Sequence, residues 1–218
     1  QGVPQDYKTA VKWYTLAAEQ GDAPAQSNLG AMYDEGRGVP QDYKTALKWW
    51  KLAAEQGYAG AQHNLGLMYN KGHGIPQDDK TAVKWYRLAA EQGNALAQTN
   101  LGVMYAKGQG VVQDYVRAHM WWNIAASQGY RDATKNRDKV AKMMTPADVS
   151  DAQYNLGVMY EKGRSVPQNH KTAVKWYTLA AEQGHAPAQS NLGWVYAKGQ
   201  GVPQDYKTAL KWWKLAAE

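Results

Sequence analysis

Residues 41–55, QDYKTALKWWKLAAE, return without a single change as residues 204–218, and this duplication decides the fold. Successive copies of the stretch are 36 residues apart, as from Tyr7 to Tyr43, except for one interval of 55 residues between Tyr115 and His170. A fixed period of this length is typical of a solenoid, in which stacked units contact mainly their neighbours. The sequence therefore predicts a repeat array with one long surface.

One repeat reads as two helices joined by short loops, and residues 25–57 serve as the example. The apolar residues Ala25, Leu29 and Met32 recur at the spacing of one helical face. Gly36 provides the backbone freedom to end this first helix. Asp42 is expected to cap a second helix, in which the apolar residues Ala46, Trp49, Trp50, Ala53 and Ala54 recur at helical spacing, and Gly57 fits its end. The predicted fold class is all-α, a right-handed α/α superhelical solenoid of antiparallel helix pairs.

Two kinds of residue are expected to set the packing of the array. A glycine recurs inside every first helix, where it costs about 1 kcal/mol relative to alanine, so we expect a notch that receives a neighbouring ring or helix. These notch glycines are Gly30, Gly66, Gly102, Gly157 and Gly193. A tryptophan recurs in every second helix and is expected to fill the seam between repeats. These are Trp13, Trp49, Trp85, Trp121, Trp176 and Trp212.

Composition narrows the classes of function. The 218 residues carry a net charge of +6, which favours acidic partners only modestly. Cysteine is absent, which excludes disulfides, thiolate metal sites and a cysteine nucleophile. The five histidines show no short metal-ligand spacing, so neither a metal nor a cofactor is predicted. No apolar run reaches the length of a membrane span, and no membrane-spanning segment is expected.

The recurring pattern AQxNLGxMYxxGxGVP, followed by DYKTAxKWYxxAAEQG, resembles the Sel1-like repeat family. The resemblance covers nearly the whole chain as five full repeats and a leading second helix. It implies a bacterial or eukaryotic solenoid related to tetratricopeptide arrays, which acts as a scaffold or adaptor and not as an enzyme. The cysteine-rich, disulfide-bonded branch of that family is not matched.

The period breaks once, and we divide the chain there. Residues 1–129 form the first set of repeats, 130–150 an irregular cap-like junction, and 151–218 two further repeats. In the junction Arg137 and Asp138 replace the Leu-Gly pair of a first helix, so the notch is lost. Thr145, Pro146 and Asp148 are expected to begin a new helix that runs directly into the next repeat. We expect the superhelix to change direction near Thr145.

Comparison of the repeats separates constant positions, which we assign to the scaffold, from variable positions, which could determine binding specificity. Four positions of the first helix differ most between copies, and their offsets of 0, 3, 7 and 10 place them on one face. We call this face the variable stripe. In chain order its residues are Pro24, Ser27, Ala31 and Asp34; Gly60, His63, Leu67 and Asn70; Leu96, Thr99, Val103 and Ala106; Asp151, Tyr154, Val158 and Glu161; Pro187, Ser190, Trp194 and Ala197.

The resemblance to tetratricopeptide arrays implies that the stripe lies on the concave side. Its mixed apolar and polar content suits an extended peptide or a partner helix. The predicted partner-binding residues are His63, Leu67, Asn70, Thr99, Val103, Tyr154, Val158, Glu161 and Trp194, with His63, Leu67, Tyr154 and Trp194 as the main anchors. Neutral drift on a solvated face is the competing interpretation of the same variation.

Other classes of function are weighed against this one. The alternative is binding of a cell-envelope glycan or similar polymer, with Tyr154 and Trp194 stacked on sugar rings. Nucleic acid is not expected, because the variable stripe is not basic and the lysine pairs of the second helices read as a solvated face. Equivalent residues of successive repeats are on the order of 10 Å apart, so repeated carboxylates do not converge on a catalytic site.

Two further questions stay open at this point. Both ends of the sequence resemble cuts through a longer array, and open ends would allow end-to-end self-association. The compartment is not determined, although an exported or periplasmic location is favoured over the cytoplasm.

Overall fold

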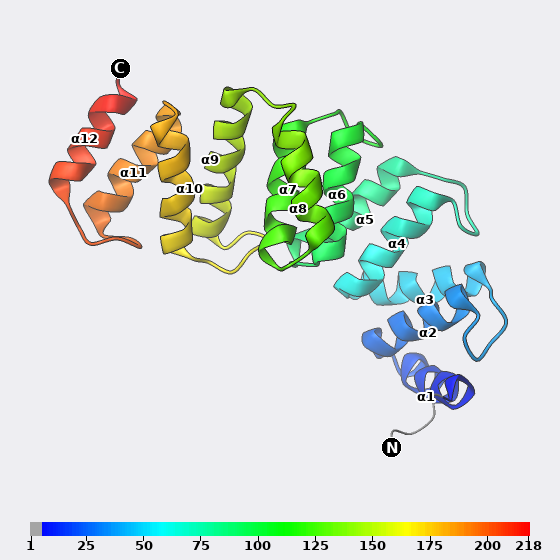
Figure 1. The fold of residues 1–218 in the computed structure, drawn as a ribbon. Helices are drawn as coiled ribbons and strands as arrows, with labels where there is room; N and C mark the ends of the chain where they lie inside the picture. The colour runs from blue at the N-terminus through cyan, green and yellow to red at the C-terminus, as the bar shows by residue number, and fades with distance from the viewer. Residues whose placement is uncertain (1–5) are drawn as a thin grey trace. The chain divides into compact units, whose positions relative to one another are not determined.

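The computed structural model describes residues 6–218, and over this range it consists of helices without strands (Figure 1). The prediction of an all-α fold is confirmed. In chain order the helices are α1 (Tyr7–Glu19), α2 (Ala23–Glu35), α3 (Tyr43–Glu55), α4 (Ala59–Lys71), α5 (Asp79–Glu91), α6 (Ala95–Lys107), α7 (Tyr115–Ser127), α8 (Arg131–Ala141), α9 (Pro146–Lys162), α10 (His170–Glu182), α11 (Ala186–Lys198) and α12 (Tyr206–Ala216). First and second helices pack as pairs in α2/α3, α4/α5, α9/α10 and α11/α12.

The chain forms two compact units, which are described separately. The N-terminal unit extends to Ala97 and includes residues 109–111, and the C-terminal unit contains residues 98–108 and 112–218. The boundary passes through α6, whose first turn belongs to the N-terminal unit. The divisions at 129 and 150 were drawn from the repeat pattern and stay predictions. The handedness of the superhelix belongs to the whole array and also stays a prediction.

The predicted helix boundaries are confirmed in the repeat of residues 25–57. The Asp42 carboxylate accepts hydrogen bonds from the backbone N–H groups of Lys44 and Thr45, at 2.9 and 3.2 Å, and so caps α3. The hydrogen bonds from the Thr45 side chain and backbone lower the pKa of Asp42. Gly36 ends α2 in the left-handed region, at φ 68°, where a glycine is tolerated without strain. In this repeat the sequence therefore encodes both the end of the first helix and the start of the second.

The predicted glycine notch is confirmed, and the structure identifies the ring that fills it. A Cβ on Gly30 would lie 2.6 Å from Cδ1 of Trp50, and one on Gly66 would lie 2.5 Å from Cδ1 of Tyr86. The rings in the notches are therefore those of the residue after the predicted tryptophan, namely Trp50, Tyr86, Trp122, Tyr177 and Trp213. This one-residue shift turns the ring toward its own first helix, since neighbouring helical positions differ by about 100° in direction.

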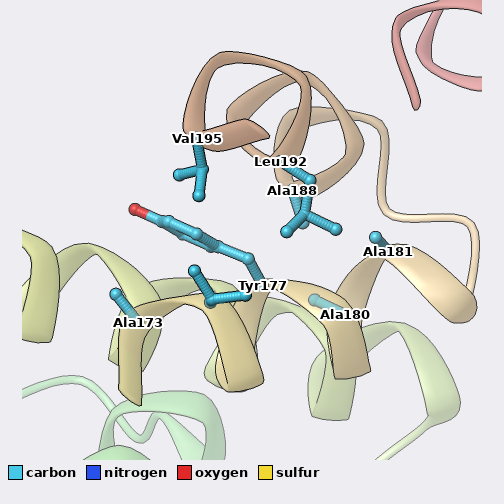
Figure 2. Close-up of a cluster of buried hydrophobic side chains, with 8 residues drawn as sticks. Ala173, Tyr177, Ala180, Ala181, Ala188, Leu192 and Val195 are labelled. Atoms are coloured by element: carbon cyan, nitrogen blue, oxygen red, sulfur yellow. The ribbon is translucent and has the colours of Figure 1, made fainter. Parts of the chain in front are cut away.

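The predicted seam tryptophans have a smaller role than expected. Trp49 and Trp85 are half-buried, and each packs on the core of the preceding repeat, as predicted for a residue between repeats. Trp121 is buried, whereas Trp13 is 68% exposed. Figure 2 shows how the fully buried ring of Tyr177 instead organises a repeat core, with Ala173 and Ala180 on its own helix and Leu192 and Val195 on α11.

Glutamine side chains connect each repeat to the next. Nε2 of Gln26 donates to the carbonyl of Ala18 at 3.1 Å, and Oε1 of Gln26 accepts from Gln56 at 2.8 Å. The same pairing recurs 30 residues apart in later repeats, between Gln62 and Gln92, Gln98 and Gln128, and Gln153 and Gln183. These amides satisfy the carbonyl groups at helix ends, which would otherwise be buried without partners.

The irregular junction has the predicted local structure. Thr145 and Asp148 form a reciprocal capping box, with hydrogen bonds of 3.1 Å to Thr145 Oγ1 and 2.9 Å to Asp148 Oδ2. Pro146 then begins α9, a 17-residue helix that continues without interruption through the notch residue Gly157. The predicted continuous helix is therefore confirmed, and the predicted change of direction stays a prediction.

A second consequence of the junction is that α8 has no second helix of its own, and α9 packs directly against α7. Ile124 of α7 is fully buried, whereas its equivalent Leu52 in α3 is 39% exposed. Val116 and Met120 are half-buried at positions where the other second helices carry exposed lysines. The apolar replacements in α7 therefore belong to a face that is covered more than in the other repeats.

Candidate partner-binding surface

The variable stripe is divided between the two units, and its residues differ widely in exposure. In the N-terminal unit Leu67 and Asn70 of α4 are half-buried, and His63 is only 9% exposed. In the C-terminal unit the predicted residues Thr99 and Val103 of α6 and Tyr154, Val158 and Glu161 of α9 are half-buried, and Trp194 of α11 is 57% exposed. Of the predicted anchors, Trp194 is therefore exposed to solvent, whereas the His63 side chain is buried.

The second position of the stripe is coupled to the ring in the notch. Where that ring is an indole, its Nε1–H donates to the backbone carbonyl of the stripe residue, as from Trp50 to Ser27 at 2.9 Å. The same bond joins Trp122 to Thr99 at 3.0 Å and Trp213 to Ser190 at 3.2 Å. The stripe residue is a small Ser or Thr in all three cases. A large indole therefore stands beside a small neighbour.

Where the notch ring is a tyrosine, the stripe residue is itself a ring. The centroids of His63 and Tyr86 are 5.9 Å apart, and so are those of Tyr154 and Tyr177. These distances are typical of favourable aromatic pairs. Much of the variation at this position therefore reflects packing within the repeat. The same pairing can be read in the sequence: a notch Trp occurs with Ser or Thr at the second stripe position, and a notch Tyr occurs with His or Tyr there. Its meaning becomes clear only from the structure, in which the two positions are in contact.

The His63 side chain illustrates this inward role. Its Nδ1 lies 3.1 Å from Oδ1 of Asn64, and burial lowers its pKa because the charged imidazolium loses hydration. A neutral, buried imidazole is suited to packing against Tyr86. His63 stays a predicted contact residue, but its ring is largely withdrawn from solvent.

The fourth stripe position also interacts with the tyrosine rings. The Tyr177 hydroxyl donates to Oε2 of Glu161 at 2.7 Å, and burial together with this carboxylate raises the tyrosine pKa. In the other tyrosine-containing repeat Asn70 donates to Oδ1 of Asp79 at 2.9 Å. Sequence comparison did not reveal the Tyr177–Glu161 bond, because the two residues lie on different helices.

The third stripe position varies in side-chain size from alanine to tryptophan. It carries Ala31, Leu67, Val103, Val158 and Trp194. The Trp194 indole meets Trp213 edge-on at a centroid distance of 5.5 Å, and the Lys198 ammonium lies 5.5 Å from the Trp194 ring centroid. These two contacts fix the orientation of the indole while leaving most of its surface in solvent.

A further cluster that sequence reasoning missed lies at the start of α11. His185 Nε2 lies 2.9 Å from Oδ1 of Asp151, and its ring stacks on Tyr154 at 4.7 Å. His185 Nδ1 accepts from the backbone N–H of Ala188 at 3.2 Å and caps the helix. The cluster links Tyr154 to the following repeat and fixes the direction of its ring.

Charge on the second helices is arranged as predicted. The lysines spaced four apart are all exposed, as for Lys44 and Lys48 in α3. Among residues 6–218 the His, Asp and Glu side chains form no group of three or more that could hold a metal ion. Over the same range no helix combines the length and the apolar character needed to cross a bilayer.

Helix pairs repeated at a fixed period, each closed by a ring in a glycine notch, define an α-solenoid repeat protein. The Sel1 repeat family model matches residues 1–22, 23–58, 59–94, 95–130, 150–185 and 186–218. The chain therefore belongs to the Sel1 repeat family, whose members generally act as protein-interaction scaffolds and are typically non-catalytic.

Two solved structures resemble the chain over 97% of its length. The protective antigen c5321 of uropathogenic Escherichia coli, which displays the same type of repeat fold, is 39% identical with a TM-score of 0.56, and the chain spans 41% of it. A Sel1 repeat protein from Oxalobacter formigenes is 36% identical with a TM-score of 0.54, and the chain spans 76% of it. A comparison with curated proteins gave no match.

Proposed function

We propose that the chain is a non-enzymatic scaffold that binds a segment of a partner protein, extended or helical, through the variable stripe of its C-terminal unit. The observation that carries the proposal is the exposure of Trp194, an indole that is 57% accessible yet held in place by Trp213 and Lys198. A large ring that is already ordered loses little entropy on binding, and such residues dominate interface energies.

The neighbouring residues of the stripe support the same use. Val103 and Val158 occupy the position of Trp194 in the two preceding full repeats of this unit, and both are half-buried. Apolar side chains with polar neighbours such as Glu161 match the composition of a protein interface. Thr99 and Tyr154, whose identities follow the notch ring, are half-buried residues of the same stripe.

The test uses a random-sequence peptide display library and a panel of cell-envelope glycan fragments, presented in parallel to the intact chain. Trp194→Ala is the test variant, and Trp13→Ala is the matched control, because Trp13 is 68% exposed on α1 and lies outside the stripe. We expect selected peptides whose dissociation constant rises about 30-fold with Trp194→Ala, as for a hot-spot residue. Trp13→Ala should leave it unchanged.

The same experiment distinguishes the competing interpretations. Saturable binding of a glycan fragment that depends on Trp194, with no peptide selected, would support the glycan alternative. Peptides that bind both variants equally well would show that the stripe is a solvated face under neutral drift.

A further inference from the structure

A cavity of about 250 Å³ opens within the C-terminal unit, where α6, α7 and α8 meet. Its apolar lining includes the stripe residues Val103 and Ala106, so the cavity is continuous with the proposed binding surface. The remaining lining residues are Lys107, Tyr115, Trp122, Asn136, Lys139, Val140 and Met143.

The cavity combines two features of the irregular junction. Lys139 of α8 stands at the third stripe position, where the full repeats carry Ala, Leu, Val or Trp. Met143, which is 57% exposed two residues after the end of α8, adds a flexible apolar wall. The altered helix therefore brings a cation and an adaptable apolar side chain to the same opening.

The polar groups of the cavity are hydrogen-bond donors without acidic partners. Lys107 and Lys139 are both exposed, and neither forms an ion pair with a carboxylate among residues 6–218. No Asp or Glu lines the cavity in this part of the chain. Two ammonium groups beside an apolar surface favour an anionic group on the ligand.

The Asn136 amide adds a third donor. Its counterpart Asn191 hydrogen-bonds to the hydroxyl of Tyr177, but the ring next to Asn136 is Trp122, whose Nε1–H is already bonded to Thr99. In the described structure the half-buried amide of Asn136 therefore lacks the partner that its counterpart has. The hydroxyl of Tyr115 accepts from Gln113 at 3.2 Å and still has its own proton to donate.

We propose that this cavity recognises an acidic–apolar pair in the bound protein segment. A large apolar side chain would enter between Val103, Trp122 and Val140, and the carboxylate of an adjacent Asp or Glu would lie between Lys107 and Lys139. At about 250 Å³ the cavity is smaller than typical cofactor or drug sites and suits a side chain. This inference rests on the proposed function, because it names the chemistry of the partner of the same surface.

The experiment measures binding of the library-selected peptides to variants of the full chain. Lys107→Glu with Lys139→Glu reverses the charge at the cavity, and Lys44→Glu with Lys48→Glu makes the same change in net charge on the exposed face of α3. Ala106→Leu fills the cavity without any change of charge. All these lysines are exposed, and thermal unfolding followed by circular dichroism verifies that each variant is folded.

We expect the selected peptides to share an Asp or Glu next to a large apolar residue. Their dissociation constants should rise about tenfold or more with the cavity charge reversal and with Ala106→Leu, and should change little with the α3 control. Selected peptides that lack the acidic–apolar pair, or that bind the cavity variants as well as the wild type, would overturn this inference and leave the proposed function standing. Failure to select any peptide would overturn both.

Discussion

Replacement of His119 by valine is expected to stabilise the protein and to remove part of its sensitivity to acid. His119 is 7% exposed in α7, and its Nδ1 has no hydrogen-bond partner in the described structure. The corresponding position carries Val83 in α5 and Val174 in α10, both buried in their repeats. Val11 in α1 is also equivalent, so the site accepts a valine in three other copies of the same helix.

The pKa of His119 sets the direction of the pH effect. Burial, and secondarily the nearby charge of Arg137, lower it from an ordinary 6.5 to about 4, although Asp138 acts in the opposite direction. Between these two values the unfolded chain binds a proton that the folded chain does not. The free energy of unfolding must therefore fall as the pH decreases through about 6.5, and this loss stops below about pH 4.

The magnitude follows from the same two pKa values. A difference of one pKa unit corresponds to about 1.4 kcal/mol. The free energy of unfolding therefore falls by about 3 kcal/mol in total between about pH 6.5 and about pH 4, and about 2 kcal/mol of this loss has occurred by pH 5. His119→Val removes this loss. It also removes a buried polar atom without a partner, which should add about 1 kcal/mol or more at neutral pH.

The assay is urea unfolding of both proteins at about pH 7.5 and about pH 5, followed by circular dichroism. Carboxylates that titrate in this range are common to both proteins, so their effects cancel in the difference. We expect the stability advantage of His119→Val to grow by about 2 kcal/mol at the lower pH. An advantage that is the same at both pH values would show that His119 is not held neutral by the fold, and the reasoning would fail.

Three further experiments test the packing of the repeats. Gly30→Ala should cost about 1–3 kcal/mol, measured by urea unfolding, because the new Cβ would lie 2.6 Å from the Trp50 ring. Tyr154→Ser and Tyr177→Trp should each lower the free energy of unfolding when made alone. The double variant should be at least about 1 kcal/mol more stable than the sum of the two losses predicts. Additive losses in this double-mutant cycle would refute the coupling between the notch ring and the second stripe position. Gln62→Leu should cost about 1–3 kcal/mol in thermal unfolding, because it leaves the Ala54 carbonyl without its hydrogen bond.

The features that could be predicted from sequence depend on neighbours along the chain. The Asp42 cap, the Gly36 terminus and the Thr145–Asp148 capping box all join residues within one or two helical turns, and they recur or stand out clearly. The notch at Gly30 was also predictable, because a glycine that recurs inside every first helix despite its energetic cost indicates a close approach by a neighbouring group.

The features that were missed depend on contacts between helices. Trp49 and Trp50 are adjacent and chemically identical, so periodicity alone did not show which ring enters the notch. His63 varies between repeats as a specificity residue would, yet it is buried against Tyr86. The cavity at Lys107 and Lys139 combines residues from two first helices, and its existence depends on their separation in space.

The alternation of notch rings has a consequence for how the chain assembles correctly. Near-identical repeats can mispair during folding, and α3 and α12 share one sequence. If α12 docked on α4, its Trp213 indole would meet the His63 ring in place of the small Ser190 that it meets in the native pair. The ring and its stripe neighbour therefore act as a matched label that distinguishes tryptophan-containing from tyrosine-containing repeats, and it disfavours docking of a helix such as α12 on the first helix of a tyrosine-containing repeat.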